Sequence, residues 1–307
     1  MTAATHSEST FTHSTTVVNN IRLHYVMGGQ GDPVVLLHGY PETSYAWRKV
    51  MPELAEHYTV IAPDLRGLGD SDKPASGYDK RTVAEDIYQL IKSLGFERIF
   101  LVGQDYGGST AYVFAAEHPE TVRRLVVIEC ASAGLIKDDV IPLVPGGGMW
   151  HRSFHLVPDL PESLIEGRER LYLSWFYQHY SRTVGAISEA DIDEYVRSYA
   201  APGGMHAGFE YYRTYFDDTE RGREYVKTKL KMPVLAIGAD SLYGAAVEKY
   251  MQTAALDVRG AIVENCGHFV SEEQPEALLN LLLPFFAEDT DDGVVKTELS
   301  NSKGMNL

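Results

Sequence analysis

The chain has 307 residues, of which 44% are hydrophobic and 23% are charged, and its formal net charge is −16. This length allows one large domain, or a core domain that carries a sizeable insertion. The negative charge argues against nucleic acid or an anionic membrane surface as the main partner, because both would repel the protein, and it favours a largely neutral small-molecule substrate.

The N-terminal sequence MTAATHSEST is polar and lacks the positive start and apolar stretch of a secretory signal, which favours a cytoplasmic protein. No apolar run approaches the length needed to span a membrane. Cys130 and Cys266 are too few for a disulfide framework, and no spacing is typical of structural zinc. We therefore expect no metal and no cofactor.

Short apolar runs alternate with helical patterns along most of the chain. Residues 81–95 show apolar side chains at three- and four-residue spacing and end at Gly95, as an amphipathic helix does. Continuous Val, Ile and Leu runs between such helices predict an α/β fold with a mostly parallel sheet flanked by helices. The runs cover residues 34–39, 59–64, 99–103, 125–129, 234–238 and 261–268.

This alternation stops after Glu129 and resumes near residue 232, with tyrosine-rich helical segments between. The pattern predicts a core formed by 1–132 and 229–290, with a helical cap at 133–228 inserted between two strands. Such an insertion would lie as a lid over the strand ends, where the chemistry of these sheets gathers. The polar end of the chain, 291–307, reads as a mobile tail.

The segment GQDYGG places Asp105 between Gly103 and Gly107, after a strand and before a helix that we expect to begin near Ser109. A glycine-rich turn with an acid is often only a turn. A sharp strand-to-helix turn, however, needs small residues on both sides and raises the middle side chain above the sheet, which describes a nucleophile elbow. The backbone amide of Tyr106 would then stabilise negative charge in the site.

Two further motifs supply partners for Asp105. In LLHGYPE, the backbone amide of Tyr40 could complete an oxyanion hole, while His38 more plausibly shapes its loop than reacts. In ENCGHFV, His268 follows a strand and a glycine, so it could swing over the strand ends as a general base. Glu129 and Asp240 both end strands and could orient the imidazole, although Asp240 could equally cap a helix or turn.

The ordered motifs HGYP, DLRGLGDSDKP, GQDYGG and NCGH resemble the α/β-hydrolase superfamily, and within it the aspartate-nucleophile branch of epoxide hydrolases and dehalogenases. The resemblance covers roughly residues 15–287. It implies the α/β-hydrolase fold, with the orienting acid after either of two strands. Bacterial epoxide hydrolases and fluoroacetate dehalogenases use the arrangement that corresponds to Glu129, which we therefore rank before Asp240.

A carboxylate nucleophile suits a saturated carbon that bears a leaving group, because Asp105 would then form an alkyl ester that water activated by His268 can cleave. An epoxide oxygen needs a proton donor as it leaves. The resemblance implies Tyr212 for this donor, with His151 as its companion and Tyr211 as the substitute. The alternative to a catalytic role is that these tyrosines belong to an aromatic stripe that packs one helix.

Departures from the dehalogenase pattern favour epoxides over halides. Fluoroacetate dehalogenases carry arginines after the nucleophile, where this chain has Tyr106 and Ser109, and a halide-binding tryptophan where it has Arg152. Haloalkane dehalogenases place tryptophan at the position of Tyr106. Trp150 could still bind a halide, so Trp150 and Arg152 are both candidate substrate-binding residues, and Gln104 replaces the histidine common before the nucleophile.

We therefore predict an epoxide hydrolase that forms a vicinal diol, with a haloalkane or haloacid dehalogenase as the alternative. A non-catalytic binding protein with this fold is disfavoured by the complete set Asp105, Glu129 and His268. The aromatic surface of the lid is one place where a second subunit could bind, so a homo-oligomer is possible.

Overall fold

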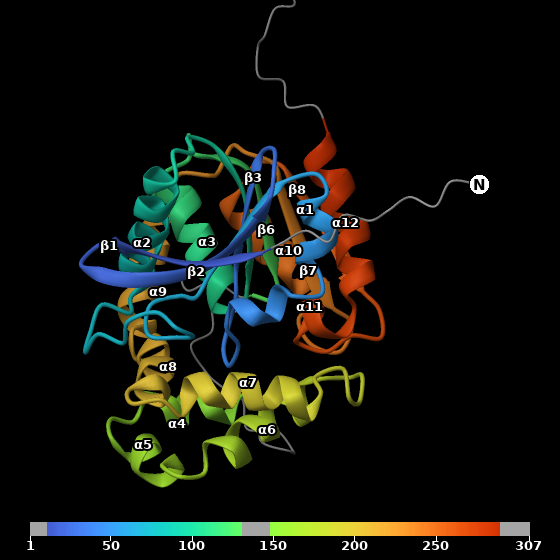
Figure 1. The fold of residues 1–307 in the computed structure, drawn as a ribbon. Coiled ribbons are helices and arrows are strands. Elements are labelled where there is room, and N and C mark those ends of the chain that lie inside the picture. Colours follow the sequence, from blue (N-terminus) through green and yellow to red (C-terminus); the bar gives the residue numbers. More distant parts are fainter. Residues whose placement is uncertain (1–10, 131–147, 289–307) are drawn as a thin grey trace, which may run out of the picture.

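The structure is a computed structural model that describes residues 11–130 and 148–288 (Figure 1). Within these ranges one sheet of eight strands runs through the core, in the order β1-β2-β4-β3-β5-β6-β7-β8. The strands are β1 Thr12–Val18, β2 Ile21–Gly29, β3 Pro33–Leu37, β4 Thr59–Pro63, β5 Ile99–Gln104, β6 Val122–Ile128, β7 Val234–Ala239 and β8 Val258–Val263. The predicted tail at 291–307 lies outside the described residues.

From β4 to β8 every pairing is parallel, as predicted. Each of the six predicted runs contributes to a strand, but the run 261–268 is strand only to Val263 and continues as the loop that carries His268. The sheet also carries an N-terminal hairpin that the sequence reading missed, in which β1 pairs with β2 and β2 with β4 in antiparallel register. Asn19 and Asn20 form its turn with φ of 44° and 63°. Such a pair of positive φ angles suits a two-residue hairpin, for which Asn is favoured.

Successive residues of the central strands point to opposite faces of the sheet, and both faces are buried. Val35 and Leu37 of β3 face one core cluster, while Val34 and Leu36 face the other. Helices cover both sides, which explains why these strands are continuously apolar rather than alternating. The core helices are α1 Met51–Ala55, α2 Lys80–Ser93, α3 Tyr106–Glu117, α10 Ala246–Ala254, α11 Val270–Glu273 and α12 Pro275–Ala287, with a 3₁₀ turn at Ser44–Trp47.

The insertion between β6 and β7 is helical, as predicted, and Figure 1 shows it lying across one end of the sheet. Its helices are α4 Trp150–Leu156, α5 Leu160–Ile165, α6 Glu169–Tyr180, α7 Glu189–Tyr199, α8 Gly204–Arg213 and α9 Tyr215–Tyr225. The start of the predicted cap, 133–147, lies outside the described residues. No helix in the described ranges is long and apolar enough to cross a membrane.

Helix α3 begins at Tyr106, earlier than the predicted start near Ser109. The glycines that suggested a longer turn lie inside the helix, because the helix approaches its neighbours very closely. A Cβ on Gly107 would lie 2.2 Å from the Leu37 carbonyl oxygen, and one on Gly108 would lie 2.8 Å from the Cβ of Cys130. These glycines therefore permit packing of α3 against β3 and the end of β6.

Substituting Gly107 by alanine tests this reading through the sign of the stability change. Helix propensity alone would make alanine stabilising by about 0.5–1 kcal/mol. The contact with Leu37 should reverse the sign, because overpacking costs about 1–3 kcal/mol. We expect a lower free energy of unfolding in urea titrations, and a gain in stability would show that close approach of α3 is not required.

Candidate active site

Asp105 lies at a strained turn between β5 and α3. Its backbone has φ 52° and ψ −119°, a conformation that L-residues rarely adopt. The turn is crowded on both sides: a Cβ on Gly103 would lie 2.2 Å from the Gly107 carbonyl oxygen, and one on Gly39 would lie 2.4 Å from the Asp105 Cβ. Such strain is characteristic of functional sites, and the predicted elbow geometry is present.

Two backbone amides hold the Asp105 carboxylate. The Tyr40 amide donates to Oδ1 at 3.0 Å, and the Tyr106 amide also donates to the carboxylate. Burial disfavours the charged carboxylate, but hydrogen bonds from His268 and from these two amides outweigh it and lower the pKa of Asp105. The side chain is 27% exposed, so the anion remains accessible from the cavity.

His268 lies between Asp105 and Glu129, in the loop that follows β8. Its Nε2 is 3.5 Å from Asp105 Oδ2, and its Nδ1 is 3.4 Å from Glu129 Oε2. The Glu129 side chain is fully buried, and its other oxygen accepts the backbone N–H of Ala239 at 2.6 Å. Glu129 thus has a partner for each oxygen, as a buried carboxylate requires.

Asp240, the other candidate for the orienting acid, binds a turn of the backbone rather than the imidazole. Its carboxylate accepts the backbone N–H groups of Asn265 and Cys266 at 3.1 and 3.2 Å. These bonds fix the turn that leads from β8 toward His268, which corresponds to the turn-capping interpretation of this residue. Of the two acids, the structure brings Glu129 to the imidazole.

The charge on His268 is set by its two acidic neighbours. Burial lowers the pKa of an imidazole, but the hydrogen bonds and negative charges of Asp105 and Glu129 outweigh this effect and raise the pKa of His268 to about 10. At neutral pH the resting site therefore holds an imidazolium between two carboxylates.

Gln104 and Glu42 support the base, and the sequence reading assigned neither of them a place there. Gln104 Nε2 donates to the His268 carbonyl oxygen at 3.0 Å and lies 3.4 Å from Glu42 Oε2. Burial, together with the charge of Glu272, raises the pKa of Glu42 to about 8. The His268 amide donates to the carbonyl of Tyr180 at the end of α6, so the lid also holds this loop.

His38 shapes the oxyanion loop, as expected. Its Nδ1 donates to the Gly39 carbonyl at 3.0 Å, and its Nε2 accepts the Leu65 amide at 3.1 Å. The ring is fully buried, and burial lowers its pKa. Both ring nitrogens are thus occupied by backbone groups.

A cavity of about 330 Å³ lies between the core and the lid. Asp105, Tyr106 and His268 line its core side, and lid residues that include His151, Arg152 and Tyr212 line the other side. This size suits a small organic molecule.

The hydroxyl of Tyr211 is hydrogen-bonded to a backbone carbonyl, whereas the side chain of Tyr212 is hydrogen-bonded to that of Tyr106. Tyr211 donates to the carbonyl of Arg66 at 3.0 Å, beneath the loop that follows β4. The Tyr212 ring meets the rings of Tyr40 and Tyr106 edge-on, with centroids 5.4 and 4.9 Å apart. Burial raises the pKa of Tyr212 well above its ordinary value, so its phenol keeps its proton.

His151 lies beside Tyr212, with ring centroids 5.7 Å apart. Burial lowers the pKa of His151 to about 3, so the imidazole is neutral. Its Nδ1 is 3.1 Å from the hydroxyl of Tyr180, which is also 2.9 Å from the Gly148 carbonyl oxygen. A neutral imidazole carries a proton on only one nitrogen, so His151 can donate from Nε2 only if Nδ1 accepts a hydrogen bond. The Tyr180 hydroxyl must then donate to Nδ1 rather than to the Gly148 carbonyl oxygen.

The two candidate substrate-binding residues of α4 lie in different surroundings. Arg152 lines the cavity, with its guanidinium 4.8 Å from the centre of the Tyr215 ring. Trp150 is not among the described residues that line the cavity. Its indole packs against Phe154 and Trp175 within the lid, with ring centroids 5.7 and 5.3 Å apart.

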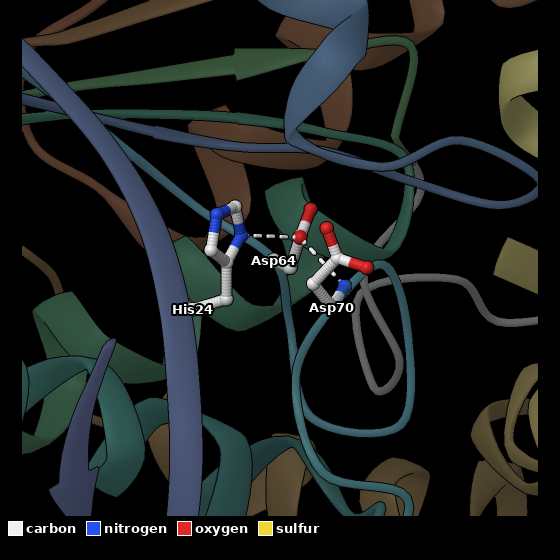
Figure 2. A group of neighbouring side chains, drawn as sticks. All are labelled: His24, Asp64 and Asp70. Carbon is white, nitrogen blue, oxygen red and sulfur yellow. Dashed lines mark hydrogen bonds and ion pairs between the residues drawn. The ribbon is translucent and has the colours of Figure 1, made fainter. Parts of the chain in front are cut away.

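A second cluster of ionisable side chains, shown in Figure 2, lies away from the cavity lining. His24 of β2 directs Nδ1 at Asp64 Oδ2 at 2.7 Å, and the same oxygen accepts the Asp70 amide at 2.9 Å. Together with Asp70 these groups come close enough to hold a metal ion. Their atoms are already engaged, since the other His24 nitrogen contacts His13 and the Asp70 carboxylate pairs with Arg197. The cluster therefore anchors the loop after β4 to β2.

Comparison with known proteins identifies the family of the chain. A family model described as alpha/beta hydrolase fold matches residues 32–275, and the chain belongs to this family. Within it, the chain is 42% identical over 280 residues to a soluble epoxide hydrolase of Corynebacterium, covering 90% of this chain and 97% of that protein.

Two other proteins are similar to most of this chain. The crystal structure of Cfl2 from Burkholderia cenocepacia is 42% identical and superposes with a TM-score of 0.86, over 90% of this chain and 96% of that one. A fluoroacetate dehalogenase of Burkholderia is 29% identical over 301 residues, covering 93% of this chain and 96% of that protein. The similarity thus extends over core and lid together.

The titration of His268 provides a test of the acid assignment that does not depend on any substrate. Glu129→Gln should lower the pKa of His268 by about 1–3 pH units, because it removes a neighbouring negative charge. Asp240→Asn, the matched control, should leave it unchanged. NMR of the imidazole ring protons measures both, and an equal response to the two substitutions would contradict the assignment.

Proposed function

We propose that this chain is an epoxide hydrolase that works through a covalent ester on Asp105 and a water molecule activated by His268. The observation that carries the proposal is the double engagement of the Asp105 carboxylate. Oδ1 accepts the Tyr40 amide, while Oδ2 faces His268, which in turn contacts Glu129. One oxygen is thus held in an oxyanion site while the other is directed toward the base.

In the first step, Asp105 Oδ2 attacks a ring carbon of the epoxide, and the carbon–oxygen bond of the ring breaks. The electron pair leaves on the epoxide oxygen, which takes a proton from Tyr212 with His151 beside it. Both groups suit this task because burial keeps the phenol protonated and the imidazole neutral. A donor matched to the leaving oxygen typically contributes about 10²–10⁴-fold in rate.

In the second step, water attacks the ester carbonyl carbon of Asp105. His268 removes a proton from that water, and the amides of Tyr40 and Tyr106 stabilise the oxyanion that forms on Oδ1. As the bond from the carbonyl carbon to Oδ2 breaks, Oδ2 takes the proton that His268 removed from water, and the diol is released. The oxygen added to the product therefore comes from Asp105, and the oxygen of water remains in the carboxylate.

Ester formation itself prepares His268 to act as a base. In the resting enzyme Asp105 and Glu129 raise the pKa of His268 to about 10, which makes the imidazole a poor base. Esterification removes the charge of Asp105, so the pKa of His268 must fall. The imidazole becomes basic at the stage when water has to be activated.

Separation of the two steps provides the central test of the proposal. His268→Gln should still be alkylated but should hydrolyse the ester slowly, so intact mass spectrometry should detect the protein plus the mass of one epoxide. Asp105→Ala should lose diol formation by about 10⁴-fold or more and show no adduct. Near-normal turnover of Asp105→Ala would refute the nucleophile.

A single turnover of the wild-type enzyme in oxygen-18 water complements this test. The first diol should contain unlabelled oxygen from Asp105, and the label should appear in Asp105. Immediate incorporation of solvent label into the diol would point to direct attack by water and against the ester.

The proton donor is tested with a matched pair of tyrosines. Tyr212→Phe should lower the rate of ester formation by about 10²-fold or more, because the epoxide oxygen loses its donor. Tyr211→Phe removes a hydroxyl that bonds the Arg66 carbonyl, so it should cost about 1 kcal/mol of stability and leave alkylation nearly unchanged. Rapid-quench mass spectrometry measures alkylation, and the reverse ranking would assign the donor to Tyr211.

The similarity to a fluoroacetate dehalogenase keeps halide displacement as the alternative. Halide departure needs N–H donors but no proton. A parallel assay of styrene-type epoxides, aliphatic epoxides and haloacids, scored for diol against halide release, separates the two reactions. Diol formation without halide release is the expected result.

A further inference from the structure

Arg152 places a positive charge in the wall of the cavity. The residue belongs to α4, directly follows His151, and is half-buried. Its guanidinium lies over the ring of Tyr215 at 4.8 Å, and it borders the same cavity as Asp105. Burial disfavours the charged guanidinium. Interactions with Tyr215, Tyr106 and Tyr243 outweigh this effect and raise the pKa of Arg152, so the side chain stays charged.

The surroundings of Arg152 differ from those of other shielded cations in the described residues. Lys80, a second basic side chain that lines the cavity, pairs with Asp218 at 3.2 Å, and the imidazolium of His268 lies between Asp105 and Glu129. Shielded arginines of the core and lid also pair with carboxylates: Arg48 with Asp191, Arg66 with Asp86, and Arg213 with Glu162. Within residues 11–130 and 148–288, no carboxylate forms an ion pair with Arg152.

A shielded guanidinium that lines a cavity, contacts Tyr215 and forms no ion pair within the described residues retains donors for an anion. Its planar donors match the two oxygens of a carboxylate, and the stacked Tyr215 ring restricts the side chain in advance. Arg152 lies on the lid side of the cavity with Tyr212 and His151, whereas Asp105 lies on the core side. An anion bound there would therefore leave Asp105 free to attack.

We infer that Arg152 binds a carboxylate group of the substrate, so that the preferred substrates are epoxides that carry a carboxylate. The inference rests on the proposed function for the reaction but not for the binding of the anion. It revises the expectation of a largely neutral substrate, which rested on the net charge of the whole chain. The overall charge of −16 disfavours anions, so a cation lining this cavity acts against the general tendency of the protein.

Arg152 could have a role other than binding a carboxylate, because its positive charge could offset the negative charge of the site. Asp105, Glu129 and a protonated His268 together carry a net charge of −1, which Arg152 could simply offset. In that case Arg152→Lys, which keeps the charge, should retain the full preference for acidic over neutral epoxides. Recognition of the carboxylate by the planar donors predicts instead that Arg152→Lys keeps only part of this preference.

The kinetic experiment therefore compares epoxyalkanoate ions of increasing chain length with their methyl esters. For wild-type enzyme we expect higher kcat/KM for the acid at one or more chain lengths. In Arg152→Gln the ratio of acid to ester should fall by about 10- to 100-fold, the range typical of a hydrogen bond to a charged group. Arg152→Lys should retain part of the preference, since it keeps the charge without the planar donors.

Arg168→Gln is the matched control, because this exposed arginine of the lid lies outside the cavity lining and its loss changes the net charge equally. Its acid-to-ester ratio should equal that of the wild type. An unchanged ratio in Arg152→Gln, or the same fall in both variants, would overturn the inference.

Calorimetric titration with hexanoate and hexanamide tests the anion site without any reaction. Hexanoate should bind the wild type more tightly than hexanamide, and Arg152→Gln should abolish the difference. Equal binding of hexanoate by wild type and Arg152→Gln would refute the anion site even if epoxides are hydrolysed. If no epoxide is hydrolysed but the difference depends on Arg152, the proposed reaction fails and the anion site stands.

Discussion

The structure depends on keeping a carboxylate ionised, shielded and still reactive at the end of a strand. Water would stabilise Asp105 but would also solvate it and weaken its attack. The fold replaces that water with two backbone amides and one imidazolium, all fixed before substrate enters. Such donors need no reorganisation during the reaction, which is why preorganised charge stabilisation is effective in catalysis.

In the proposed reaction the lid has a different task, because it has to provide a proton without adding negative charge near Asp105. Tyrosine meets this need because burial raises its pKa and keeps the phenol neutral. The aromatic packing around Tyr212 serves the same end by excluding water and fixing the ring. The lid also contacts the His268 loop through the Tyr180 carbonyl, so closure of the cavity and placement of the base are connected.

The sequence predicted the features that depend on local patterns. Apolar runs predicted the parallel strands, the interruption of those runs predicted the lid, and the glycine spacing predicted the Asp105 elbow. The hairpin of β1 and β2 was missed because β1 consists mainly of exposed or half-buried polar residues, and because its Asn-Asn turn is a weak signal. The support of His268 by Gln104 could not be read from the sequence, since it joins residues 164 positions apart through a backbone carbonyl.

The carboxylate site inferred at Arg152 differs from the neutral substrate that the net charge suggests, and the reason lies in the range of electrostatic forces. A net charge acts on a molecule as it approaches, but salt screens charges beyond about 8 Å under physiological conditions. Inside the cavity the nearest groups dominate, and there Lys80 is paired with Asp218 while Arg152 faces tyrosines. An acidic protein can thus present a locally positive wall to a bound ligand, and in our proposal the chemistry of that wall selects which epoxide is held in place for Asp105.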